Sequence, residues 1–238
     1  MIDFHCHILP QVDDGPDRLS ESLTLLRRSW QQGVECMVST CHFYADADYP
    51  KQFIQRRNTA FRRLREATLR DAEAYPVVIL GAEVLYFPGI SEAQDIEMLT
   101  IGSGGAILIE PPMAPWSDTM LDEIVQLGEN LHCKPVIAHV DRFMGMLGDK
   151  RLIDRVLERE LLVQVNAEYF LDPRTVRSAV HNLEKGKIHL IGSDCHNLTN
   201  RAPNLGLARQ QAKAYGVEAE FNELRRNALK LLFPRGKQ

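Results

Sequence analysis

Short apolar runs alternate along the chain with longer stretches in which apolar residues recur at every third or fourth position. Most of the short runs are consecutive Val, Ile and Leu residues, which is typical of parallel strands that are buried on both faces. These runs predict seven strands, at Met1–His5, Glu35–Thr40, Val77–Ala82, Ala106–Glu110, Pro135–His139, Leu161–Asn166 and Ile188–Ser193.

The longer stretches predict helices between and after the strands. Asp17 and Gly33 suit the two caps of the first helix, since an Asp side chain accepts from free amides and Gly adopts the left-handed conformation. The predicted helices are Asp17–Gln32, Arg56–Tyr75, Met120–Leu131, Lys150–Arg159, Pro173–Lys185, Asn204–Tyr215 and Val217–Leu232. This alternation predicts an α/β fold, and seven repeats favour a closed or nearly closed parallel barrel. Without a linker or break in composition, residues 1–238 are expected to form one domain.

Polar and ionisable residues follow the predicted strands at their carboxyl ends. In a parallel barrel these ends meet at one rim, where barrel enzymes carry their catalytic residues. Nine residues of metal-ligand type fall there, namely His5, His7, Asp14, His42, Glu83, Glu110, His139, Asp194 and His196. Asp13 is an alternative to Asp14. Asp3 shares the strand face of His5 and His7, and is therefore a candidate acceptor for an imidazole N–H.

Nine candidate ligands are too many for one metal ion. The set contains nitrogen and oxygen donors only, which suits manganese, zinc or iron(II) better than a structural thiolate zinc site. With four or five ligands for each ion and some bridging carboxylates, two or three ions fit. The sequence therefore predicts a centre with several metal ions at the rim.

Composition and charge narrow the range of partners and compartments. The net charge of −4, from 28 basic and 32 acidic residues, does not favour nucleic acid or a membrane surface. We expect no signal segment, and no apolar run is long enough to span a bilayer, which indicates a cytoplasmic protein. The five cysteines form no Cys-x-x-Cys pair, so we expect reduced thiols.

Motifs at 1–10, 12–16, 38–42, 81–83, 108–110, 135–139 and 193–197 resemble, in order, those of the PHP superfamily of metal-dependent phosphoesterases. Within it, the chain resembles the bacterial tyrosine-protein phosphatases of the CpsB/CapC type, which regulate capsule and exopolysaccharide synthesis. The resemblance implies a distorted seven-stranded (β/α)7 TIM-like barrel with three divalent metal ions, typically manganese, with iron(II) or zinc as alternatives. It also implies that the substrate is phosphotyrosine in the tail of a tyrosine kinase.

The resemblance also distributes the candidate ligands over three ions. It implies one ion at His5, His7, Glu83 and Asp194, a second at Glu83, Glu110 and His139, and a third at Asp14, His42 and His196. Asp14 is preferred over Asp13 because it directly precedes Gly15. Many PHP members have His where this chain has Glu110, and Glu is typical of the tyrosine-phosphatase branch.

Two arginines are expected at the same rim. Arg142 follows His139 and Arg201 follows His196, and similar relatives use arginines at these places to hold phosphate. The guanidinium group suits this task because its fork matches two phosphate oxygens. The Pro-rich segment 111–116 would lie beside the site.

Other interpretations remain open. One is a PHP phosphatase that acts on a small phosphate monoester such as histidinol phosphate. Cys195 and Arg201 have the Cys-x5-Arg spacing of cysteine-dependent phosphatases, but that loop lacks the glycines of a phosphate cradle and we expect Cys195 to point away. Five arginines between Arg56 and Arg65 would suit a surface for nucleic acid, another subunit in a homo-oligomer, or an acidic phosphoprotein.

Overall fold

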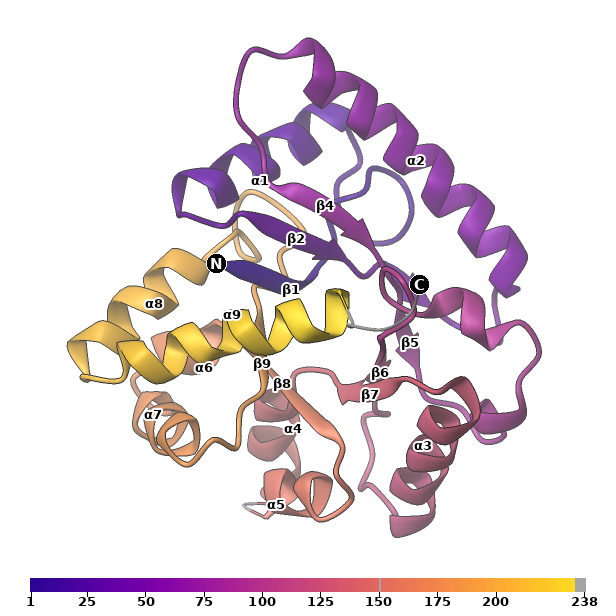
Figure 1. Cartoon of the computed structure of the whole chain (residues 1–238), viewed down its shortest axis with the longest axis vertical. Coiled ribbons are helices and arrows are strands. Elements are labelled where there is room, and N and C mark those ends of the chain that lie inside the picture. Colours follow the sequence, from indigo (N-terminus) through magenta and orange to yellow (C-terminus); the bar gives the residue numbers. More distant parts are fainter. Residues whose placement is uncertain (150, 234–238) are drawn as a thin grey trace.

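The computed structural model, which describes residues 1–149 and 151–233, has parallel strands at its centre and helices around them (Figure 1). One sheet has the order β1 (Ile2–Cys6), β2 (Cys36–Ser39) and β4 (Val77–Leu80). The other has the order β3 (His42–Phe43), β5 (Glu83–Leu85), β6 (Ala106–Glu110), β7 (Lys134–Ile137), β8 (Leu162–Asn166) and β9 (Leu190–Gly192). The predicted α/β class and the parallel pairing are confirmed.

Two of the predicted strands are interrupted. The strand predicted at Glu35–Thr40 is β2, and the chain resumes as β3 after a break at Thr40 and Cys41. The strand predicted at Val77–Ala82 is β4, and the chain resumes as β5 after Gly81 and Ala82. A Cβ atom on Gly81 would lie 2.7 Å from Cγ1 of Ile101, so this close approach requires glycine. The described residues therefore form nine strands, and seven continuous strands are not found among them.

The strands curl so that β1 lies beside the end of β9. The backbone N–H of Asp194 donates to the carbonyl of His5 at 2.8 Å, and that of His7 donates to the carbonyl of Cys195 at 2.9 Å. These bonds bring segments from the two ends of the sequence to one rim. Several of the predicted ligands lie in these segments.

The helices surround the strands, with α2 along one edge and α9 across the front of Figure 1. They are α1 (Leu19–Gln31), α2 (Pro50–Arg70), α3 (Asp118–Leu131), α4 (Val140–Leu147), α5 (Leu152–Leu157), α6 (Glu168–Leu171), α7 (Val176–Glu184), α8 (Leu205–Ala214) and α9 (Glu218–Leu232), with 3₁₀ turns at Ile90–Glu92 and Ile96–Leu99.

Three helices differ from the sequence prediction. Helix α2 begins at Pro50 rather than Arg56, because proline is favoured at the first helical position. Helix α4 begins three residues after the end of β7 and was not predicted, and the short helix α6 was not predicted either. The helix predicted from Lys150 is found as α5, and Lys150 itself lies outside the described residues.

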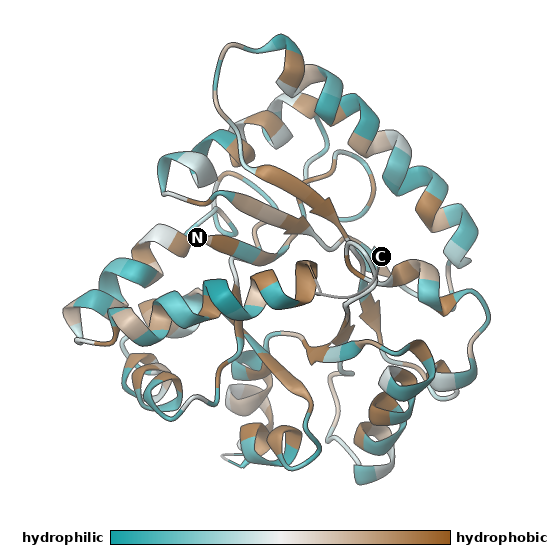
Figure 2. Cartoon of the chain, in the orientation of Figure 1, coloured by the Kyte–Doolittle hydropathy of each residue, from teal (hydrophilic) through white to brown (hydrophobic). Residues whose placement is uncertain are grey.

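The strand residues separate an apolar end from a polar end. In β6, Ala106 and Leu108 belong to a buried apolar cluster that also contains Phe4 and, from α9, Leu232. Glu110 shares their face of the strand, because alternate residues point the same way, and it lies at the carboxyl end. Figure 2 shows the strands as mainly hydrophobic. No helix in the described ranges is long and apolar enough to cross a membrane. The five cysteines are free thiols, and three of them, Cys6, Cys41 and Cys195, are buried.

Candidate metal centre

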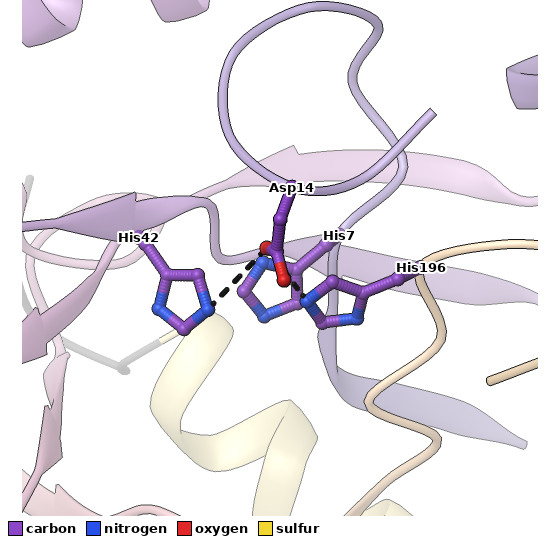
Figure 3. A group of neighbouring side chains, drawn as sticks. All are labelled: His7, Asp14, His42 and His196. Atoms are coloured by element: carbon purple, nitrogen blue, oxygen red, sulfur yellow. Dashed lines mark ion pairs between the residues drawn. The ribbon is translucent and has the colours of Figure 1, made fainter. Parts of the chain in front are cut away.

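The structure brings all nine predicted ligands together at the carboxyl rim. Seven of them form three overlapping groups in which the ligand atoms lie within 4.8 Å of one another. The groups are His7, Asp14, His42 and His196 (Figure 3), then His5, His7 and Glu83, and finally His42, Glu83 and Glu110. The other two adjoin these groups: His139 Nε2 lies 2.8 Å from Glu83 Oε1, and Asp194 Oδ1 lies 3.6 Å from His7 Nε2.

Glu83 lies at the middle of the cluster and its side chain is almost completely buried. Its Oε2 is 3.1 Å from His5 Nε2, 3.2 Å from His7 Nε2 and 3.1 Å from His42 Nδ1. Among the described residues, none of these approaches has the geometry of a hydrogen bond, and Oε2 has no hydrogen-bond partner. Ring nitrogens and a carboxylate oxygen that converge in this way present lone pairs to a common point, as metal ligands do.

The outer nitrogen of three imidazoles is held by a protein acceptor. His5 Nδ1 donates to Gln164 Oε1 at 3.2 Å, His7 Nδ1 donates to Asp13 Oδ2 at 2.7 Å, and His196 Nδ1 donates to the carbonyl of Asp194 at 2.9 Å. With the proton on Nδ1, each ring presents the lone pair of Nε2 to the centre. This is the tautomer and the outer partner that metal-binding histidines have.

Asp13 and Asp14 have different surroundings. Asp14 Oδ1 lies 3.1 Å from His196 Nε2 and 3.6 Å from His42 Nε2, inside the group drawn in Figure 3. Asp13 instead accepts from His7 Nδ1 and, at 3.0 Å, from the backbone N–H of His42. The geometry therefore favours Asp14 as the ligand and gives Asp13 the task of orienting His7.

Protonation in the cluster follows burial and the nearby carboxylates. Burial, together with the charges of His7 and Arg201, lowers the pKa of His196 to about 4, so this imidazole is neutral. Burial also lowers the pKa of His139, but Glu110 and Glu83 outweigh it and raise the pKa to about 9. Carboxylates that hold a proton on His139 so strongly also attract a metal cation, which competes for the same lone pair. The residues present therefore fit a centre of divalent metal ions.

Both predicted arginines contact one ligand candidate. Arg142 and Arg201 pair with the two carboxylate oxygens of Asp194, and Asn166 Nδ2 also donates to it at 3.0 Å. The two arginine side chains are about one-third exposed, at 35% and 32%. They line a cleft of about 340 Å³ that extends from Asp194 toward α6. A phosphate group in this cleft would meet both guanidinium groups beside the cluster.

One predicted role is wrong and one residue was missed. Asp3 does not accept from an imidazole: it accepts from the backbone N–H of Ser193 at 2.8 Å and from its hydroxyl at 2.6 Å, and so ties β1 to the end of β9. Its pKa is raised to about 6 because burial outweighs these hydrogen bonds. The missed residue is Gln164. Its side chain orients His5 and accepts from the backbone N–H of His139 at 2.6 Å. A polar residue inside an apolar strand, two positions before Asn166, was the available signal.

Cys195 is completely buried in the apolar cluster that packs outside the strands. Its carbonyl accepts from His7, and its N–H donates to Ser193 Oγ at 3.2 Å. Cys195 is not among the residues that line the cleft beside Arg142 and Arg201. The geometry disfavours a cysteine nucleophile.

The family model described as "Capsular polysaccharide synthesis, CpsB/CapC" matches residues 1–233 of the chain. The chain is 29% identical to the tyrosine-protein phosphatase CpsB of Streptococcus agalactiae serotype V, over 96% of this chain and 94% of that protein. It is 30% identical to the tyrosine-protein phosphatase CpsB of Streptococcus pneumoniae, over 92% of each. Its fold is similar to a crystal structure from a study of YwqE from Bacillus subtilis and CpsB from S. pneumoniae, described as metal-dependent tyrosine phosphatases. That match has a TM-score of 0.81 at 22% identity and covers 98% of this chain and 94% of the other.

Proposed function

The chain belongs to the CpsB/CapC family of capsular polysaccharide synthesis, and we propose that it is a metal-dependent phosphatase that hydrolyses phosphotyrosine in proteins. The observation that carries this proposal is the convergence of three imidazole nitrogens on Glu83 Oε2, at 3.1–3.2 Å, without hydrogen bonds. Two arginines lie beside this convergence, on Asp194. Metal ligands next to a pair of phosphate-binding groups suit hydrolysis of a phosphate ester.

We propose three divalent ions, with manganese as the first choice and iron(II) or zinc as alternatives. The ligands would be those of the three groups, with His139 and Asp194 added: His5, His7, Asp14, His42, Glu83, Glu110, His139, Asp194 and His196. Bound metal ions polarise the phosphoryl oxygens and lower the pKa of a water molecule toward neutrality. His7, His42 and Glu83 each belong to two of the groups, so these side chains would be shared between neighbouring ions.

The residues of the chain itself bind and orient the substrate. Arg142 and Arg201 would hold the non-bridging phosphoryl oxygens in fork-like contacts, and Asp194 would position both guanidinium groups. A phenol has a pKa of about 10, so the tyrosine leaves without a dedicated general acid. Gln164 and Asp13 would keep the rings of His5 and His7 in their ligand orientation.

The proposed substrate is a phosphotyrosine protein, namely the tail of a bacterial tyrosine kinase that controls capsule or exopolysaccharide synthesis. The site is open at one edge, where the side chain of Asp14 is 59% exposed. This exposure favours a protein segment as the substrate. We also propose that the two sheets act as one seven-stranded barrel in a single domain, in which β2 continues as β3 and β4 continues as β5.

A metal and substrate panel tests this proposal. The purified chain is stripped with a chelator, reloaded with manganese, iron(II) or zinc, and assayed on a phosphotyrosine peptide, a phosphoserine peptide and histidinol phosphate. We expect hydrolysis of the phosphotyrosine peptide that is lost with chelator and restored by metal. Preference for histidinol phosphate would favour the small-molecule alternative, and activity that survives chelation would contradict the metal centre.

A further inference from the structure

Helix α2 concentrates positive charge in an acidic chain. It carries seven basic residues and one acidic residue, a net charge of +6, whereas the whole chain has a net charge of −4. The rest of the chain therefore has a net charge of −10. Figure 2 shows that much of α2 is hydrophilic. A separation of charge on this scale creates a local positive potential that attracts anions.

The arginines of α2 differ in whether they have a partner: Arg62 donates to Thr59 Oγ1 and Arg70 pairs with Glu66. Arg57 is buried, donates to the carbonyl of Gly81 at 2.8 Å and packs over the ring of Phe53, so it supports the fold. Arg56 pairs with Asp48 at 2.6 Å. Arg63 and Arg65 are exposed, and neither has a partner within residues 1–149 and 151–233. Nothing in the fold explains these two charges.

Arg63 lines a groove of about 290 Å³ between α2 and the loop that follows β1. The groove is also lined by Gln11, Gln52, Gln55, Arg56 and Thr59. No acidic residue is among its lining, and the amide, hydroxyl and guanidinium groups all offer hydrogen-bond donors. The groove therefore suits a chain segment that carries carboxylate or phosphate groups.

Each wall of the groove is connected to a loop that carries ligand candidates. Gln11 lies in the loop between His7 and Asp14, and three residues of extended chain span at most about 10 Å. On the other wall, Arg56 is held by Asp48, which lies in the loop that follows His42. A polypeptide that leaves the centre between these two loops would enter the groove.

We propose that this groove binds an acidic stretch of the phosphoprotein substrate, next to the phosphotyrosine, with Arg63 as its main contact. This inference rests on the proposed function of the centre. An acidic peptide fits better than nucleic acid because no aromatic side chain lines the groove to stack on bases. The acidic remainder of the chain would also repel a long polyanion.

The test compares peptides and matched variants. The substrates are free phosphotyrosine, a phosphotyrosine peptide with several flanking Glu and Asp residues, and the same peptide with Gln and Asn in their place. The variants are Arg63→Gln and, as control, Arg65→Gln. Residues two apart on a helix point about 200° away from each other, so Arg65 makes the same charge change outside the groove.

We expect the wild-type chain to prefer the acidic peptide in kcat/KM, and the preference to fall with salt. Arg63→Gln should reduce this preference about two- to fivefold, which is the size of the contribution of an exposed ion pair. Its activity on free phosphotyrosine should stay unchanged. Arg65→Gln should keep the wild-type preference. An equal effect of both variants, or no preference in the wild type, would overturn the proposal.

A binding measurement separates this inference from the proposed activity. Fluorescence anisotropy with the unphosphorylated acidic peptide reports on the groove even if the chain hydrolyses nothing, and we expect weaker binding by Arg63→Gln only. Failure of hydrolysis with intact peptide binding would reject the phosphatase and keep the groove. Binding of a labelled single-stranded oligonucleotide that Arg63→Gln weakens, without binding of the acidic peptide, would assign the groove to nucleic acid instead.

Discussion

The amino ends and the carboxyl ends of the strands carry different kinds of side chain. At the amino end, Ala106, the first residue of β6, is buried in the apolar cluster that also contains Leu232 of α9. At the carboxyl end, Glu110 of the same strand joins a cluster of imidazoles and carboxylates. The amino end excludes water around apolar groups, which stabilises the fold. The carboxyl end gathers buried charges, which stabilise a fold only when they are fully partnered.

This difference separates stability from function along each strand. A change at the amino end should alter the free energy of unfolding and leave the chemistry of the folded molecules intact. A change at the carboxyl end should alter metal binding and activity.

Glu83→Gln should have the largest effect, because it removes the charge at the middle of the cluster while keeping the size of the side chain. We expect activity on a phosphotyrosine peptide to fall roughly a hundredfold or more, beyond the usual loss for an outer partner of a metal ligand. Metal content by mass spectrometry should fall with it. Far-ultraviolet circular dichroism should match the wild type, and near-normal activity in Glu83→Gln would contradict the proposed centre.

Leu232→Ala tests the amino end, because Leu232 of α9 lies against the segment that precedes β6. Truncation of a leucine that is only 2% exposed leaves a cavity and should lower the free energy of unfolding by about 2–5 kcal/mol. Urea denaturation followed by fluorescence measures this change. Metal content and activity per folded molecule should remain within about twofold of the wild type, because the substitution removes packing contacts and leaves every metal ligand in place. A loss of metal as large as that of Glu83→Gln would show that the two ends are coupled.

Asp13→Asn tests the outer partner of His7. The variant keeps the shape but replaces the ionised acceptor of His7 Nδ1, so metal affinity or activity should fall about 10–100-fold. Asp17→Asn, in an exposed position before α1, is the control for the same chemical change. If Asp13→Asn abolished metal binding as completely as Glu83→Gln, Asp13 would be a ligand itself.

The smallest effect is expected at His189, which precedes β9 at the amino end. Its Nδ1 accepts from the backbone N–H of Val163 at 3.0 Å, and burial lowers its pKa. The unfolded chain therefore binds a proton at this histidine before the folded chain does, and unfolding free energy falls as pH drops below about 6.5. In the metal-stripped protein, His189→Gln should make the slope between pH 7.5 and 5.5 shallower by at most about 1.4 kcal/mol per pH unit. An unchanged slope in chemical denaturation would contradict the lowered pKa.

Sequence patterns predicted the order and type of most elements because these depend on neighbours along the chain. Continuous apolar runs located the strands, and polar residues after them located the rim. Helix α4 was not predicted because only Ala138 and His139 separate it from β7, and the apolar pattern assigned these two residues to the strand. The breaks after β2 and β4 escaped because they depend on close approaches such as that of Gly81 to Ile101.

The sequence by itself determined which residue types could reach the rim: alternation along a strand and the shared carboxyl end require no knowledge of the chain path. The tertiary structure decided how those residues are used. Asp13 and Asp14 are neighbours in the sequence, yet one orients His7 and the other faces His196. Gln164 contacts His5 across 159 residues, and Asp3 contacts Ser193 across 190. Partners so far apart are fixed by how the sheet curls, which no local pattern records.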